Sequence, residues 1–242
     1  AVTFTNKAAN EMRERLDRLL NGAANALTIG TFHAVCCRIL RADGRAVGLS
    51  PGFVVYDDDD QVNLIKQSLL ELQLDPKTFS PRLIQASISA AKSRLLSEQH
   101  HAEGVDSYFE EIVQRVYQRY QALLTQSDAV DFDDILLKAV RLFESQPDVL
   151  ARYRKRYRHI LVDEFQDTNL AQFELVRLLA CEHRNVCVVG DPDQSIYSWR
   201  SADPRNLISF EREFPEAKVV LLEQNYRSTK TILKAAMQVI SG

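Results

Sequence analysis

The sequence has few cysteines and no apolar run long enough to cross a membrane. It also has no recognisable signal peptide. The four cysteines are Cys36, Cys37, Cys181 and Cys187. No two of them have the C-x-x-C spacing of zinc sites and redox motifs. We therefore expect a reduced, cytoplasmic protein with no membrane partner.

The chain also lacks a strong charge of either sign and a phosphate-binding loop. Its 30 basic and 33 acidic residues give a net charge of −3. Nucleic-acid binding would therefore need a local binding surface rather than an overall positive charge. No segment reads G-x-x-x-x-G-K-[ST], the loop whose amides and lysine hold phosphates. With 242 residues, 45% of them hydrophobic, the composition suits one large globular domain or two small ones.

The most informative segment is Ile160-Leu-Val-Asp-Glu-Phe-Gln-Asp-Thr168, an apolar run that ends in Asp163 and Glu164. Strands of a parallel α/β sheet present such carboxylates at the carboxyl edge, where ligands bind. In nucleoside triphosphate hydrolysis, one carboxylate holds Mg²⁺ and its neighbour orients or deprotonates water. Taken alone, the pair is more typical of a strand end followed by a helix cap.

A second apolar strand, residues 186–190, also runs into acidic residues, in Asp191-Pro-Asp-Gln194. The amphipathic residues 169–182 between the two strands complete a βαβ unit. Gln194 can hydrogen-bond a terminal phosphate or a water molecule.

Aromatic residues follow at once, in Ser195-Ile-Tyr-Ser-Trp-Arg200. Tyr197 and Trp199 share one side of an extended backbone, which suits base stacking. Arg200 would point elsewhere, as a phosphate-reading group can. For a lone tryptophan, a core position is the more common role.

The rest of the pattern predicts an α/β domain interrupted by helices. Strands are predicted near residues 1–5, 27–30, 159–163, 186–190 and 218–222. A helix with one apolar face, including Leu19, is predicted over residues 6–20. Between about 33 and 145 the pattern is almost wholly helical, and its predicted helix starts lie at Asp57, Ser80-Pro81 and Asp131.

These segments resemble the ordered motifs of UvrD/Rep/PcrA-type superfamily 1 DNA helicases, and the resemblance spans the chain. The matching segments are Ala1-Val-Thr-Phe-Thr-Asn-Lys-Ala-Ala9 (motif Ia), Thr31-Phe-His33 (motif Ib), Val162-Asp-Glu-Phe-Gln-Asp-Thr168 (motif II), Gly190-Asp-Pro-Asp-Gln-Ser-Ile-Tyr-Ser-Trp-Arg200 (motif III) and Leu222-Glu-Gln-Asn-Tyr-Arg-Ser228 (motif IV). Motifs of this length in this order are highly specific.

The resemblance implies a site for ATP and Mg²⁺. Asp163 is similar to the family's Mg²⁺ ligand, Glu164 to the base that activates water, and Gln194 to the γ-phosphate sensor. Arg200 and Arg227 resemble contacts that neutralise charge on the γ-phosphate. Tyr226 resembles the aromatic residue that stacks on adenine.

The resemblance also implies contacts to single-stranded DNA. Base stacking would fall to Phe4, Tyr197 and Trp199. Backbone contacts would come from Thr5, Asn6, Lys7, Thr31 and His33, and Asn6 and Lys7 open a helix whose amides suit a phosphate. A buried strand position for Phe4 and a packing role for His33 are the structural alternatives.

The implied fold class is α/β, a parallel RecA-like P-loop NTPase sheet, incomplete here, with an inserted all-helical subdomain. The family layout assigns residues 1–32 and 146–224 to the first RecA-like domain (1A), 33–145 to the inserted subdomain (1B), and 225–242 to the start of the second RecA-like domain (2A). The phosphate loop would precede residue 1. We therefore expect a fragment that is inactive alone.

The implied function of the whole enzyme is that of an ATP-dependent 3′–5′ DNA helicase, a monomer or weakly self-associating, acting on single-stranded DNA and single-strand/duplex junctions. A binding module for single-stranded DNA without chemistry is the main alternative. A metal-dependent nuclease using Asp131, Asp133 and Asp134 with the 163–164 pair is disfavoured, because the two groups fall in different predicted domains. The basic segment 152–158 is predicted to be a solvated helix end at the amino edge of the sheet.

Overall fold

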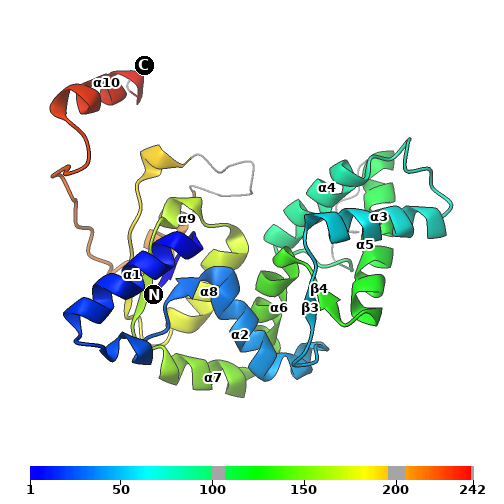
Figure 1. The fold of residues 1–242 in the computed structure, drawn as a ribbon, viewed down its shortest axis with the longest axis horizontal. Helices are drawn as coiled ribbons and strands as arrows, with labels where there is room; N and C mark the ends of the chain where they lie inside the picture. Colours follow the sequence, from blue (N-terminus) through cyan, green and yellow to red (C-terminus); the bar gives the residue numbers. More distant parts are fainter. Residues whose placement is uncertain (100–106, 196–204, 241–242) are drawn as a thin grey trace.

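The computed structural model describes residues 1–99, 107–195 and 205–240, and Figure 1 shows two adjoining parts. One part is built around a parallel sheet and the other consists of helices. Between them runs α6, Phe132–Ser145. The α/β class with a parallel sheet and many helices agrees with the sequence-based expectation.

The main sheet has the strand order β2-β1-β5-β6, and all neighbouring strands are parallel. The strands are short: β1 Val2–Thr3, β2 Gly30–Thr31, β5 Ile160–Val162 and β6 Val186–Val188. Because β1 lies between β2 and β5, the first residues of the chain neighbour the acidic segment that follows Val162. Parallel alignment brings the carboxyl ends of all four strands to one edge.

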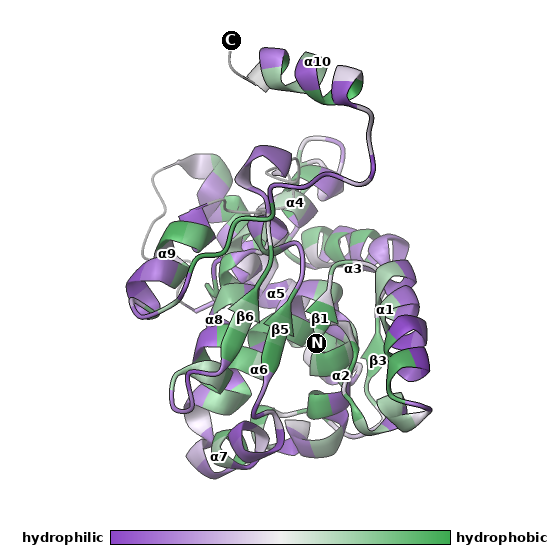
Figure 2. Ribbon diagram, turned by 90° about the vertical axis from the view of Figure 1, so that its left-hand side faces the viewer, coloured by the Kyte–Doolittle hydropathy of each residue, from purple (hydrophilic) through white to green (hydrophobic). Residues whose placement is uncertain are grey.

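Helices cover one face of this sheet, whereas on the other face α1 (Asn6–Leu19) packs beside β1 and β2 and leaves β5 open. The core under the sheet joins apolar residues of α2 (Phe32–Asp43), α6 and α8 (Leu170–Ala180) to Val162. On the other face, Leu161 of β5 is 51% exposed and Val189 is 48% exposed. Figure 2 shows the apolar strands β5 and β6 side by side.

The helical part has its own core, formed by α3 (Asp58–Glu71), α4 (Pro81–Ser93) and α5 (Tyr108–Gln126). A two-stranded parallel ribbon, β3 Val54–Val55 with β4 Ala129–Val130, pairs the segment that enters this part with the one that leaves it. Both α2 and α6 pack with the sheet, although they lie within residues 33–145 or at their border. The domain boundaries at 33 and 145 stay a prediction.

The predicted helix starts in the helical part are confirmed. Asp57 caps α3 in a reciprocal capping box with Asp60, so the aspartate run is a cap. Pro81 opens α4. Asp131 caps α6 by accepting the backbone N–H of Asp134 at 2.7 Å.

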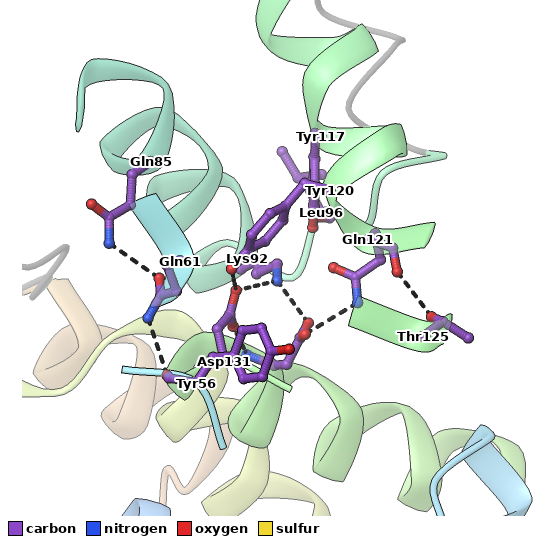
Figure 3. A network of polar contacts seen from close by, with 11 residues as sticks. Tyr56, Gln61, Gln85, Lys92, Leu96, Tyr117, Tyr120, Gln121, Thr125 and Asp131 are labelled. Atoms are coloured by element: carbon purple, nitrogen blue, oxygen red, sulfur yellow. Dashed lines mark hydrogen bonds and ion pairs between the residues drawn. The ribbon is translucent and has the colours of Figure 1, made fainter. Parts of the chain in front are cut away.

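A buried ion-pair network joins α4, α5 and α6, as Figure 3 shows. The Nζ of Lys92 lies 2.6 Å from Oδ2 of Asp131 and 2.9 Å from Oδ1 of Asp134. Tyr120 donates to Asp131 at 2.9 Å and Gln121 donates to Asp134 at 3.1 Å. Burial alone would lower the pKa of Lys92, but attraction to the two carboxylates outweighs it and raises that pKa above its usual value.

Two expectations are wrong. Residues 218–222 form no strand, and Val219, Val220, Leu221 and Leu222 are between 66% and 82% exposed. A strand needs a hydrogen-bonded neighbour, and none pairs with this segment in the described part of the chain. Leu19 does not belong to the buried face of α1 (Asn6–Leu19), because it lies at the last turn and is 76% exposed.

The remaining α-helices of the described residues are α7 Pro147–Arg156, α9 Arg205–Glu213 and α10 Lys230–Ile240. The basic segment is the end of α7, as expected, and Arg152 and Arg154 form ion pairs with Asp43 and Glu182. Figure 1 shows α10 standing apart from the body. None of the helices in the described residues has the length and apolarity needed to cross a membrane.

Candidate functional site

Asp163 directly follows β5 at the carboxyl edge of the sheet. Its backbone N–H donates to the carbonyl of Val2 at 3.0 Å, which extends the pairing with β1. The hydroxyl of Thr3 donates to Oδ2 of Asp163 at 3.2 Å. The carboxylate is therefore held at the sheet edge by a residue from the first strand of the chain.

Glu164 has a left-handed backbone, with φ of 53° and ψ of 44°. For a residue other than glycine this conformation costs on the order of 1–2 kcal/mol. Neighbouring hydrogen bonds hold it, since Phe165 donates its N–H to the carbonyl of Val189 at 2.9 Å. The short 3₁₀ helix Phe165–Asp167 follows this turn.

The loop after β6 lies beside this turn. Asp191 accepts the N–H of Asp193 at 3.0 Å and the side-chain amide of Gln194 at 2.6 Å. The proposed phosphate sensor Gln194 is thus held by an aspartate of its own loop. Its neighbours Tyr197, Trp199 and Arg200 lie outside the described residues.

The start of α1 lies at the same edge. Thr5 is its N-cap and accepts the N–H of Ala8 at 3.1 Å. Thr5, Asn6 and Lys7 are exposed, and Phe4 is half-buried. The exposed first turn leaves backbone N–H groups available to an anion.

The start of α2 lies next to it, because β1 and β2 are aligned with Thr3 opposite Thr31. Thr31 caps α2 by accepting the N–H of Ala34 at 3.2 Å. The ring of His33 meets the ring of Phe132 edge-on, with centroids 5.9 Å apart. Burial lowers the pKa of His33 to about 4, so at neutral pH it can donate a hydrogen bond but supplies no positive charge.

This burial predicts a pH dependence of stability. The unfolded chain binds a proton on His33 near pH 6.5, whereas the folded chain does so only near pH 4. The stabilisation is therefore fully present above the unfolded value and is lost as pH falls through this window. Urea unfolding at about pH 7.5 and about pH 5 should show wild type losing more stability on acidification than His33→Gln. Equal losses would contradict the assignment.

Tyr226 and Arg227 lie on the irregular segment before α10. Tyr226 is 92% exposed, and the backbone N–H of Arg227 donates to Oδ1 of Asn225 at 2.9 Å. Arg227 and Asp163 both border a hollow of about 1270 Å³ along the open face of the sheet. Tyr226 is not among the residues that line it.

Sequence reasoning missed two residues that the structure places among these groups. Gln166 is buried and contacts both Glu164 and the loop after β6. Phe132 is 48% exposed and packs against His33. The signal for Gln166 was its place within the acidic segment, while Phe132 lay in a segment read only as a helix cap.

Comparison with known proteins identifies the family of the chain. The sequence model of the UvrD/REP helicase N-terminal domain matches residues 1–215. The chain belongs to the UvrD/REP helicase family. It is 48% identical over all 242 residues to the ATP-dependent DNA helicase PcrA of Bacillus subtilis, and 49% identical to that of Leuconostoc citreum.

The same alignments show how much of a family protein the chain represents. It spans 33% of the Bacillus subtilis protein and 32% of the Leuconostoc citreum protein. A PcrA of Staphylococcus aureus, 47% identical, is likewise covered to 33%. The chain therefore corresponds to about a third of the length of each of these relatives.

The nuclease alternative receives no support from the geometry. The ammonium of Lys92 lies between Asp131 and Asp134, where a metal ion would have to bind. Among the described residues, no group of three His, Cys, Asp or Glu side chains could hold a metal. The aspartates at the start of α6 thus have a structural role.

Proposed function

We propose that the chain is part of an ATP-dependent DNA helicase that moves 3′ to 5′ on single-stranded DNA and unwinds duplex. One observation carries this proposal. The acidic turn after β5 shares the carboxyl edge of the sheet with the N-termini of α1 and α2. The residues proposed to bind nucleotide and those proposed to bind DNA therefore follow neighbouring strands.

The acidic turn would serve the nucleotide. Asp163 fits a Mg²⁺ ligand, because Mg²⁺ is usually held by one or two carboxylates together with substrate phosphates and water. When bound, Mg²⁺ would neutralise charge on the phosphates. Glu164 would accept a proton from the attacking water, and Gln194, Arg200 and Arg227 would contact the γ-phosphate. Tyr226 would stack on adenine.

The helix starts would serve the DNA. Thr5, Asn6 and Lys7 would contact the phosphate backbone at the start of α1, and Thr31 and His33 at the start of α2. Bases would stack on Phe4, Tyr197 and Trp199. Phe132 extends this set, because its exposed ring adjoins His33.

The test compares the 242-residue chain with a full-length protein that contains it. The full-length protein should hydrolyse ATP faster when single-stranded DNA is added, whereas the chain alone should hydrolyse it negligibly. The reason is that the chain has no G-x-x-x-x-G-K-[ST] loop to bind the triphosphate. A coupled ATPase assay with and without oligonucleotide measures both.

Each alternative has its own outcome. A full-length protein that binds single-stranded DNA but shows no DNA-stimulated hydrolysis would support the binding module. Robust hydrolysis by the pure chain would overturn the expectation that it is inactive alone. A nuclease assay with the same oligonucleotide serves as the control for the metal-dependent alternative.

A further inference from the structure

Gln166 occupies a buried position between the acidic turn and the loop after β6. Its side chain is 1% exposed. Its Nε2 donates to Oε2 of Glu164 at 2.8 Å, and its Oε1 accepts the backbone N–H of Asp191 at 3.1 Å. The side-chain amide of Gln166 therefore bonds to the carboxylate of Glu164 in the acidic turn and to the backbone N–H of Asp191 in the loop after β6.

The two segments approach so closely that only glycine fits opposite this amide. A Cβ on Gly190 would lie 2.7 Å from Oε1 of Gln166 and 3.2 Å from its backbone nitrogen. The backbones of the same two segments are also joined directly, because the N–H of Phe165 donates to the carbonyl of Val189. The position of Gln166 is thus fixed by packing as well as by hydrogen bonds.

The hydrogen bonds continue into the loop. Asp191, whose N–H is bound by Gln166, accepts the side-chain amide of Gln194 at 2.6 Å. A continuous path of polar contacts therefore runs from Glu164 through Gln166 and Asp191 to Gln194. Hydrogen bonds in such a chain polarise one another, and each fixes the orientation of the next.

We propose that Gln166 is a positioning residue that holds Glu164 and the Asp191–Gln194 loop in one geometry, so that loop movement changes the orientation of the base. The inference rests on the proposed function, in which Glu164 activates water and Gln194 senses the γ-phosphate. Gln166 itself faces Glu164, Asp167 and Asp191. The side-chain amide of Gln166 donates to the carboxylate through Nε2 and accepts from the backbone through Oε1.

The activity test uses the full-length protein with Gln166→Leu and Gln166→Glu. We expect kcat for DNA-stimulated hydrolysis to fall about 10- to 100-fold in both, the scale of a misplaced catalytic group. ATP affinity should change less than about 3-fold, because the proposed nucleotide contacts are made by other residues.

Gln172→Leu is the matched control. Gln172 is 6% exposed and also accepts a backbone N–H, that of Asn169, but within the N-terminal cap of α8. This variant should lose stability while keeping kcat. A purely structural role for Gln166 would make the Gln166→Leu and Gln172→Leu variants behave alike, and that result would overturn the proposal.

A second measurement does not depend on activity. In the 242-residue chain, amide hydrogen exchange of Asp191 should speed up in Gln166→Leu and stay slow in Gln172→Leu. If amide exchange of Asp191 is unchanged in Gln166→Leu, the proposed contact between the two segments is wrong. If exchange changes but the wild-type full-length protein shows no DNA-stimulated hydrolysis, the proposed function fails and the contact between the two segments stands.

Discussion

Replacing Lys92 with methionine is expected to lower the free energy of unfolding of the chain by about 3–5 kcal/mol, the usual cost of breaking a buried ion pair. The variant leaves Asp131 and Asp134, which are 2% and 1% exposed, without their cation. Methionine fills much of the lysine volume, so the loss arises from charge more than from a cavity. Urea unfolding followed by circular dichroism measures it.

Two companion variants identify the cause. Lys66→Met on α3 removes an exposed lysine and should change stability by less than about 0.5 kcal/mol. Adding Asp131→Asn and Asp134→Asn to Lys92→Met should recover part of the loss, because the amides carry no charge and asparagine still caps a helix. No recovery in the triple variant would show that packing, not unpaired charge, dominates.

Replacing Glu164 with glutamine in a full-length protein is expected to reduce ATP hydrolysis at least about 100-fold, the scale of a lost general base. Glutamine preserves the shape of the side chain but cannot accept the proton of the attacking water. ATP binding should remain nearly intact, because the proposed Mg²⁺ ligand is Asp163. Single-turnover hydrolysis and nucleotide titration separate the two effects.

The neighbouring carboxylate provides the contrast. Asp163→Ala should weaken binding of the Mg²⁺–nucleotide complex, since it removes the proposed metal ligand. Glu182→Gln changes an exposed glutamate just after α8 that pairs with Arg154, and it should leave both properties unchanged. Hydrolysis at the normal rate in Glu164→Gln would mean that another residue is the base.

The sequence predicted those features that depend on local patterns. Asp57 and Asp131 were recognisable as helix caps, and the strand before Asp163 was recognisable from its apolar residues and acidic end. These features need only neighbours in sequence. The carboxyl-edge placement of Asp163 followed from the rules of parallel sheets, and the structure agrees.

Features that depend on distant partners were not predictable. Lys92 looked like an ordinary helix lysine, because the two aspartates that bind it follow 39 or more residues later. The role of Gln166 depends on its hydrogen bond with Asp191, which lies 25 residues later in the loop after β6, so the sequence did not reveal it. Residues 218–222 had the composition of a strand, but composition does not supply the neighbour that a strand requires.

The exposed apolar residues 219–222 have a practical consequence for work with the isolated chain. An exposed, uncharged stretch of β-branched and leucine side chains without a partner strand tends to pair with the same stretch of another molecule. The amount of soluble protein recovered for a variant would then report self-association through this segment, whatever the state of its core. The Lys92 and Gln172 variants are therefore best ranked by unfolding at low protein concentration rather than by yield.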